Sequence, residues 1–175
     1  MKINNKKGIL FWITGISGSG KTTLGKKIFK EITNEYGKTI LLNGDDFRNI
    51  FQLKKYSYED RLALATGYSK FCKKITDQKI NVIFTTVSMF HKVRTYNNNN
   101  IENYLEIFIK TDLKKIILKN KKILYRKKNK KNIVGIDINI EIPKKPSIVL
   151  NNNFSDDLNF ISRKLLKKIE NTIKI

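Results

Sequence analysis

A glycine-rich stretch near the N-terminus limits the possible folds more than any other part of the chain. Four residues separate Gly15 from Gly20, and Lys21 and Thr22 follow directly, so every fixed position of the pattern GxxxxGK[ST] is matched. An apolar run over residues 9–13 precedes the stretch. The glycines let backbone N–H groups surround a polyphosphate, and the positive end of a following helix adds to their effect. The stretch therefore predicts a strand, a phosphate-binding loop and a helix, because the flanking patterns argue against a chance match in a Gly/Ser-rich turn.

The loop over residues 15–22, called the P-loop below, predicts a nucleoside triphosphate as ligand. Lys21 is expected to neutralise phosphate charge and so to take part in catalysis, and Thr22 is expected to offer its hydroxyl to Mg²⁺. The residues expected to bind ATP are Gly15, Ile16, Ser17, Gly18, Ser19, Gly20, Lys21, Thr22 and Thr23.

The length of 175 residues predicts a single domain, residues 1–175, that is large enough to bury a core. No run of about 18 apolar residues occurs, and the polar N-terminal segment does not read as a secretion signal, so a cytoplasmic protein without a membrane partner is expected. The single cysteine, Cys72, falls in a helical pattern and is expected to be a buried, inert thiol.

The formal net charge of +21 raises the possibility of nucleic-acid binding. Most of the 36 basic residues are lysines, however, and interleaved aromatic residues typical of a single-strand platform are missing. We therefore interpret most of the charge as solvated surface and do not expect a nucleic-acid partner. The few arginines are more informative, because a guanidinium grips anions with a fork that lysine lacks. They are Arg48, Arg61, Arg94, Arg126 and Arg163.

Strand and helix patterns alternate along the chain, which predicts an α/β fold with a parallel β-sheet flanked by helices on both faces. A tetra-asparagine run at residues 97–100 is expected to be a flexible loop. Strands are expected at residues 9–13, 39–42, 81–86, 104–110 and 148–150, and helices at 21–36, 58–77, 112–120 and about 156–173.

Eight of the thirteen residues from 119 to 131 are Lys or Arg. A solvated surface run is one interpretation of this segment. In a nucleotide kinase the same position would hold a basic lid that closes over phosphates, here over about residues 119–143.

Sequence context favours a small-molecule kinase over a switch or a motor. The base-reading motif Asn-Lys-x-Asp of a switch GTPase has no match, because the nearest string, residues 129–132, ends in Asn. A kinase needs a carboxylate near the acceptor hydroxyl or the Mg²⁺, and cations for the transition-state charge. Asp45, which follows the second strand, is the best carboxylate, and Asp46 could instead cap a helix. Arg48 and Arg61 are placed to hold an anionic acceptor.

Several motifs in order resemble adenylyl-sulfate kinase, a P-loop kinase family that phosphorylates the 3′-hydroxyl of adenosine 5′-phosphosulfate. The resemblance covers about residues 9–150. It rests on the P-loop stretch at 11–24, Leu-Asn-Gly-Asp-Asp-Phe-Arg at 42–48, Tyr-Ser-Tyr-Glu-Asp-Arg at 56–61, the element at 87–94, Lys-Ile-Leu-Tyr at 122–125, and Gly-Ile-Asp at 135–137 with Glu141 and Pro143.

The resemblance implies roles for individual residues. Asp45 would be the catalytic or Mg²⁺-organising carboxylate, sharing the metal with Thr22, and the implied catalytic residues are Asp45, Lys21 and Ser88. Ser88 matches a serine described as a phosphoserine intermediate in the family, but acceptor contact is the better physical role because in-line transfer needs no covalent step. The implied acceptor-binding residues are Arg48, Tyr56, Arg61, Leu64, Ser88, Met89, Lys122 and Ile133.

The departures from the family pattern gather where the acceptor is expected to bind. Tyr56 and Ile133 stand where the family has two stacking Phe rings, Leu64 stands where it has an acceptor-reading Asn, and Met89 replaces a Pro. Asn43 replaces the first Asp of Asp-Gly-Asp, and Lys119 replaces a lid Arg. These changes leave the phosphoryl-transfer residues in place and predict an altered acceptor.

The favoured acceptor is cytidine diphosphoramidate, the substrate of a relative that acts in phosphoramidate decoration of capsular polysaccharide. Loss of one stacking ring is compatible with a smaller base. Adenylyl sulfate is the alternative acceptor, and a catalytically weak P-loop protein with a binding or regulatory role is a lesser alternative. The expected partners are ATP and a nucleotide acceptor, and a homodimer is possible.

Overall fold

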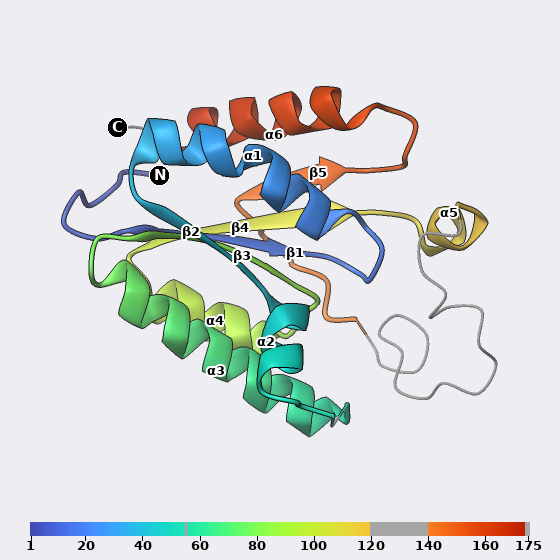
Figure 1. The fold of residues 1–175 in the computed structure, drawn as a ribbon, viewed down its shortest axis with the longest axis horizontal. Helices are drawn as coiled ribbons and strands as arrows, with labels where there is room; N and C mark the ends of the chain where they lie inside the picture. The colour runs from blue at the N-terminus through green and yellow to red at the C-terminus, as the bar shows by residue number, and fades with distance from the viewer. Residues whose placement is uncertain (55, 120–139, 174–175) are drawn as a thin grey trace.

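The computed structural model describes residues 1–54, 56–119 and 140–173. Within them, parallel strands form one sheet in the order β2-β3-β1-β4-β5 (Figure 1). This arrangement confirms the predicted parallel sheet. The strands are β1 (Ile9–Thr14), β2 (Thr39–Asn43), β3 (Asn81–Thr86), β4 (Asn103–Lys110) and β5 (Ile148–Asn151).

Helices cover both faces of the sheet, as predicted. In Figure 1, α1 and α6 lie on one face, and α2, α3 and α4 lie on the other. Their bounds are α1 (Lys21–Tyr36), α2 (Gly44–Ile50), α3 (Tyr58–Thr76), α4 (His91–Asn100), α5 (Leu113–Leu118) and α6 (Leu158–Thr172).

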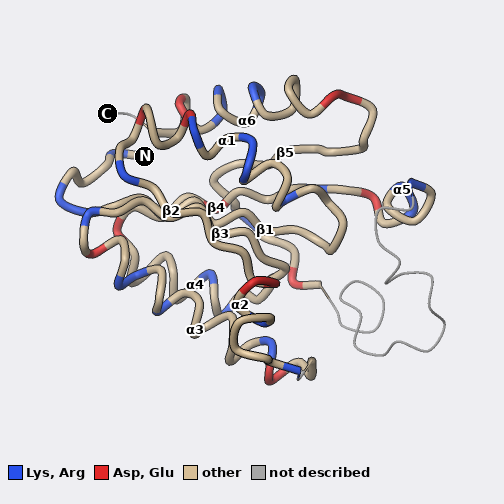
Figure 2. The backbone as a smooth tube through the Cα atoms, in the orientation of Figure 1, with Lys and Arg blue, Asp and Glu red and all other residues tan. Residues whose placement is uncertain are grey.

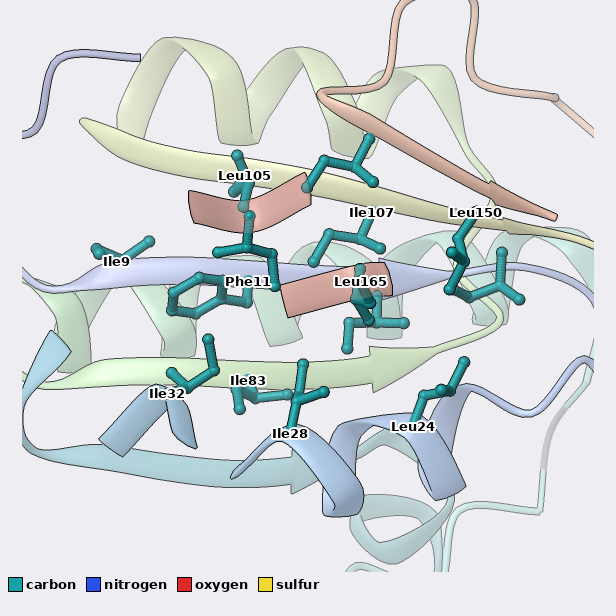
Figure 3. Packing of buried hydrophobic residues seen from close by; sticks show 14 of the residues in the cluster. Ile9, Phe11, Leu24, Ile28, Ile32, Ile83, Leu105, Ile107, Leu150 and Leu165 are labelled. Atoms are coloured by element: carbon teal, nitrogen blue, oxygen red, sulfur yellow. The ribbon is translucent and has the colours of Figure 1, made fainter. Parts of the chain in front are cut away.

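Alternation along β1 explains why its whole apolar run is buried. Successive strand residues point to opposite faces, so Phe11 and Ile13 pack toward α1 and α6, and Trp12 packs toward α3 and α4. Figure 3 shows the first of these clusters around Phe11, Ile28 and Leu165. On the other face, the Trp12 ring stacks on Phe84 with 5.0 Å between the ring centroids. Because both faces of the sheet are covered at β1, its residues 9–13 appear in the sequence as an unbroken apolar run.

Cys72 is buried among the side chains between the sheet and α3, as expected. Burial raises the pKa of its thiol, which disfavours the reactive thiolate. The thiol therefore has a packing role in the structure.

The prediction of a loop at residues 97–100 was wrong, because the asparagines form the last turn of α4. Asn97 is fully buried and lies one helical turn after Val93, which is also buried. The backbone N–H of Ile101 donates to the Asn97 carbonyl at 2.9 Å, and the Asn100 amide donates to the Tyr96 carbonyl at 2.8 Å. The run of identical residues hid the helical spacing of Val93 and Asn97, which places both side chains on the buried face of α4.

The short helix α2 was not predicted, although its start signal is present. The Asn43 side chain accepts a hydrogen bond from the Asp45 backbone N–H at 3.0 Å and so caps the helix. Asp45 and Asp46 occupy the first turn, where the helix dipole favours negative charge. Asn43 thus keeps a capping function without adding a charge next to Asp45.

None of the helices in residues 1–54, 56–119 and 140–173 combines the length and the apolar character needed to cross a membrane. Figure 2 shows Lys and Arg on helices of both faces of the sheet. In the described part of the chain, the basic residues are therefore not gathered on one face of the sheet.

Candidate active site

A cavity of about 1050 Å³ lies among the segments that follow the strands. The carboxyl ends of parallel strands meet at one edge of a sheet, which is where ligands bind in open α/β folds. Segments far apart in the sequence line it: the P-loop with the start of α1, the first turns of α2 and α3, the end of β3, and the chain between β5 and α6.

Two glycines give the P-loop its shape. Gly15 has φ 152°, and a Cβ there would lie 2.6 Å from the Ile109 carbonyl oxygen, so a side chain cannot fit against β4. Gly20 has φ 93° immediately before α1, in the left-handed region that glycine adopts without strain. The Lys21 ammonium, which is largely buried, donates to the Ile16 carbonyl at 2.7 Å across the loop.

Most of the predicted ATP-binding residues line the cavity: Ser17, Gly18, Gly20, Lys21, Thr22 and Thr23. Gly15, Ile16 and Ser19 do not line it. Ile16 and Ser19 are buried, and Ile16 packs with apolar residues below the loop. Their contribution to the loop in this structure is through the backbone and through packing.

Asp45 and Asp46 are both exposed, but only Asp45 lines the cavity. The first turn of α2 is fixed from below, because the Tyr68 hydroxyl donates to the Gly44 carbonyl at 3.0 Å. Burial raises the pKa of Tyr68 to about 12, so the hydroxyl keeps the proton that it donates. A Cβ on Gly44 would lie 3.0 Å from the Thr86 hydroxyl oxygen, which shows how closely the turn approaches β3.

Arg48 and Arg61 lie beside one ring, that of Tyr56. The guanidinium carbons of Arg48 and Arg61 are 4.6 and 5.2 Å from the ring centroid, within cation–π range. Arg61 Nε also donates to the Tyr56 carbonyl at 3.0 Å. Burial, and then the nearby charge of Arg48, lower the pKa of Arg61. Two cations brought together at a cavity wall form a place where an anionic group would be stabilised.

Ser88 also lines the cavity, and its Oγ lies 2.9 Å from Thr86 Oγ1. The neighbouring Met89 does not line the cavity, so the structure does not support its predicted acceptor contact. Met89 is 3% exposed and packs with Ile16 and Ile116. The physical reason is that Met89 has apolar neighbours from the P-loop, β4 and α5, among which its side chain is removed from water.

The structure brings together the remaining acceptor-binding predictions that lie in its described part. Arg48, Tyr56, Arg61 and Leu64 all line the same cavity as the P-loop residues. Lys122 and Ile133, and most of the predicted lid, lie outside the residues that the structure describes. Sequence reasoning missed other residues of the cavity wall: Tyr68, Thr86, Phe90, Asn152, Phe154 and Asp156. Asn152 and Asp156 follow β5 as Asp45 follows β2, so the same rule about strand ends could have found them.

A buried ion pair joins α4 to β4. Arg94 Nε lies 2.6 Å from Glu106 Oε1, and both side chains are less than 10% exposed. Burial raises the pKa of Glu106, and the Arg94 guanidinium opposes that shift. Arg94 Nη1 also donates to the Glu141 carbonyl at 2.6 Å. The pair therefore links α4, β4 and the chain that leads into β5.

Glu141 connects the start of α4 with the start of α3. Its carboxylate accepts hydrogen bonds from the backbone N–H of His91 and from the Tyr58 hydroxyl, the latter at 2.9 Å. Burial opposes ionisation of Glu141, but these hydrogen bonds outweigh it and lower its pKa. The N-cap residue of α4, Phe90, makes no side-chain cap. The Glu141 carboxylate, from a distant part of the chain, instead accepts the hydrogen bond of the His91 N–H at the start of the helix.

Among the described residues, no group of three or more His, Cys, Asp or Glu side chains is placed to hold a metal ion. Mg²⁺ bound to a nucleotide takes only a few protein oxygens and completes its shell with phosphates and water. Thr22 and Asp45, whose side chains carry oxygen atoms of the kind that Mg²⁺ prefers, both line the cavity.

Comparisons with known proteins place these observations in a family. The sequence model of adenylylsulphate kinase matches residues 7–151. The chain is 36% identical over 163 residues to cytidine diphosphoramidate kinase of Campylobacter jejuni, covering 91% of this chain and 95% of that protein. It is 28% identical over 174 residues to adenylyl-sulfate kinase of Pseudomonas aeruginosa, covering 96% of this chain and 88% of that protein.

Solved structures show the same fold. The Mycobacterium tuberculosis APS kinase in complex with AMPPNP and APS superimposes with a TM-score of 0.81 at 21% identity, over 94% of this chain and 98% of that one. Another kinase structure, a gluconokinase from Sinorhizobium meliloti, gives a TM-score of 0.60 at 12% identity, over 96% of this chain and 94% of that one. These likenesses concern the architecture alone.

Proposed function

The chain belongs to the adenylylsulphate kinase family and is therefore an ATP-dependent phosphotransferase, and on that premise we propose that it phosphorylates the 3′-hydroxyl of a nucleotide. The family membership confirms the resemblance found in the motifs. The observation that carries the proposal is that the P-loop residues Lys21 and Thr22, the carboxylate of Asp45, and the Arg48–Arg61 pair line one cavity. Residues that can bind the phosphates of ATP, a carboxylate that can act as a base, and a pair of cations that can bind an anionic acceptor thus lie in the same cavity.

The proposed reaction is a direct in-line transfer. The acceptor 3′-oxygen forms a bond to the γ-phosphorus of ATP, the bond from that phosphorus to the β-γ bridging oxygen breaks, and ADP leaves. Asp45 accepts the hydroxyl proton, Lys21 neutralises charge on the phosphates, and Ser88 orients the acceptor. Thr22 and Asp45 would hold Mg²⁺, which when bound neutralises charge on the β- and γ-phosphates. A phosphorylated Ser88 has no part in this scheme.

We propose cytidine diphosphoramidate as the acceptor, which would place the enzyme in phosphoramidate decoration of capsular polysaccharide. The Campylobacter jejuni relative that carries this substrate in its name supports the proposal, as do the replacements at the acceptor wall. Leu64 lines the cavity with an apolar side chain where the family reads its acceptor with Asn. The Tyr56 ring is partnered by guanidinium groups, so the acceptor base would meet a cationic wall as well as an aromatic one. Adenylyl sulfate is the alternative acceptor.

A coupled assay of ATP consumption with the two acceptors side by side tests the acceptor. We expect a higher kcat/KM for cytidine diphosphoramidate than for adenylyl sulfate. A much higher kcat/KM for adenylyl sulfate would contradict the proposed acceptor and leave the proposed reaction intact. Turnover of neither acceptor by a protein that still binds ATP would favour a binding or regulatory role. The predicted homodimer and cytoplasmic location stay predictions.

Replacing Arg48 with Ala should raise the KM for the acceptor by about ten- to a hundredfold, because a charged hydrogen bond contributes roughly 1.5–3 kcal/mol. The KM for ATP should change little, because the proposed ATP contacts come from the P-loop, whereas Arg48 lies on α2 against the Tyr56 ring. Initial rates measured against each substrate separate the two effects. Arg163→Ala is the matched control, since Arg163 lies at an exposed position of α6 and the variant removes the same charge. An unchanged acceptor KM in Arg48→Ala would remove Arg48 from acceptor binding.

A further inference from the structure

Three consecutive asparagines, residues 151–153, lie at the end of β5 and directly after it, and they differ in how far they are buried. Asn151 and Asn153 are exposed, whereas Asn152 is 6% exposed and lines the cavity. The backbone N–H of Asn152 donates to the Lys110 carbonyl at 3.0 Å, which continues the pairing of β4 with β5 by one residue. Its side chain is therefore held by the rigid edge of the sheet.

Both ends of the Asn152 amide have partners. Nδ2 donates to the Ser19 carbonyl of the P-loop at 2.9 Å, and Oδ1 accepts from the Phe154 backbone N–H at 3.2 Å. A carbonyl can only accept and a backbone N–H can only donate, so the two partners together fix which end of the amide is which. The contact joins parts of the chain that are 133 residues apart.

The Ser19 carbonyl matters because of the peptide to which it belongs. In a trans peptide the C=O and N–H groups point in opposite directions, and none of the described peptide bonds is cis. With the Ser19 oxygen held toward Asn152, the N–H of Gly20 points the other way. Gly20 lines the cavity, and its N–H lies at the start of α1, where backbone N–H groups bind phosphate.

Close packing reinforces this arrangement. A Cβ on Gly20 would lie 2.9 Å from Asn152 Nδ2, so the asparagine amide rests against the backbone of the loop. Gly20 with φ 93° has no side chain to restrict its own rotation, so the Asn152 contact adds a restriction that the residue itself lacks.

We propose that Asn152 is a positioning residue for ATP, one that holds the Ser19–Gly20 peptide with its N–H toward the phosphates. This inference rests on the proposed function, because it assumes that the P-loop binds ATP. Without the Asn152 donor, the peptide can rotate, and the loop must be reordered each time ATP binds. Loss of one such hydrogen bond and of the preformed loop should weaken ATP binding on the order of tenfold.

Calorimetric titration of the full chain with Mg·ATP, with no acceptor present, tests the proposal. Asn152→Leu removes the donor at similar size, and Asn152→Asp keeps the shape and the acceptor for Phe154 while removing the donor. Both should raise the Kd for ATP by about tenfold or more. Asn153→Asp is the control, because it adds the same charge one residue away at an exposed position, and it should leave the Kd within about twofold.

Steady-state kinetics separate positioning from a general structural role. The Asn152 variants should raise the KM for ATP and leave the KM for the acceptor unchanged, whereas partial unfolding would affect both. A Kd for ATP within twofold of the unmodified protein in either Asn152 variant would overturn the inference, as would failure of both variants to fold, which would make the role structural. If the unmodified protein itself does not bind ATP, the proposed function fails instead.

Discussion

Replacing Asp45 with Asn should lower kcat by at least about a hundredfold, because a positioned general base contributes roughly 10²–10⁴ to the rate. The amide has the size of the carboxylate but cannot accept the hydroxyl proton. The Kd for ATP should change by less than a factor of about three, since the P-loop N–H groups and Lys21 supply most of the phosphate contacts. Single-turnover rates together with calorimetric ATP titration measure both quantities. If Asp45 also organises Mg²⁺, the variant should need a higher Mg²⁺ concentration for half-maximal rate.

Asp46→Asn is the matched control for this prediction. Asp46 is in the same first turn of α2 and is also exposed, but it does not line the cavity. Its replacement removes the same charge and should leave kcat within about a factor of two to three, because exposed charges are screened. Near-normal kcat in Asp45→Asn, or an equal loss in both variants, would contradict the role proposed for Asp45.

Replacing Glu106 with Gln should lower the free energy of unfolding by roughly 3–5 kcal/mol, the usual cost of removing one partner from a buried ion pair. Arg94 cannot lose its proton to relieve the unpaired charge. For a chain of this length such a loss corresponds to a fall in Tm of roughly 6–20 °C. Thermal unfolding followed by circular dichroism measures the fall, and chemical denaturation gives the free energy of unfolding.

Asp77→Asn makes the same carboxylate-to-amide change in exposed ion pairs. Asp77 contacts Lys7 and Lys73 at 2.8 and 2.6 Å, with about a third of each side chain exposed, and exposed pairs contribute about 0–1 kcal/mol. Its Tm should therefore fall much less than that of Glu106→Gln. The double replacement Arg94→Met with Glu106→Leu should recover much of the loss, because it leaves no unpaired charge between α4 and β4. Equal falls in Tm for Asp77→Asn and Glu106→Gln would show that the buried ion pair contributes no more to stability than the exposed pairs do.

The sheet could be predicted from the sequence because its central strands are buried on both faces. Residues 9–13 therefore appear as a continuous apolar run and residues 82–84 as a shorter one, and Gly37 marks the end of α1. The asparagine run in α4 and the short helix α2 could not be predicted in this way. Their stability depends on contacts from elsewhere, such as the packing of Asn97 and the hydrogen bond from Tyr68 to Gly44.

Some residues of the candidate site could likewise be predicted from the sequence, and others could not. Motifs pointed to Lys21, Asp45 and Arg48, because phosphoryl transfer needs cations and a carboxylate in the segments that follow the strands. The structure brings all three residues to one cavity. Met89 was expected to contact the acceptor but packs with Ile16 and Ile116, and the sequence carries no signal for that packing. The rule about strand ends could have pointed to Asn152 as a residue of the cavity, but its hydrogen bond to the Ser19 carbonyl, 133 residues away, carries no sequence signal.

Transfer of label from [γ-³²P]ATP tests the central proposal most directly. The full chain is incubated with labelled ATP and Mg²⁺, with cytidine diphosphoramidate, with adenylyl sulfate, or with no acceptor, and the products are separated and treated with a 3′-specific nucleotidase. We predict that label enters an acceptor nucleotide, that the nucleotidase removes it, and that none is bound covalently to the protein. Label found only as inorganic phosphate, label on Ser88, or label that resists the nucleotidase would contradict direct transfer to a 3′-hydroxyl.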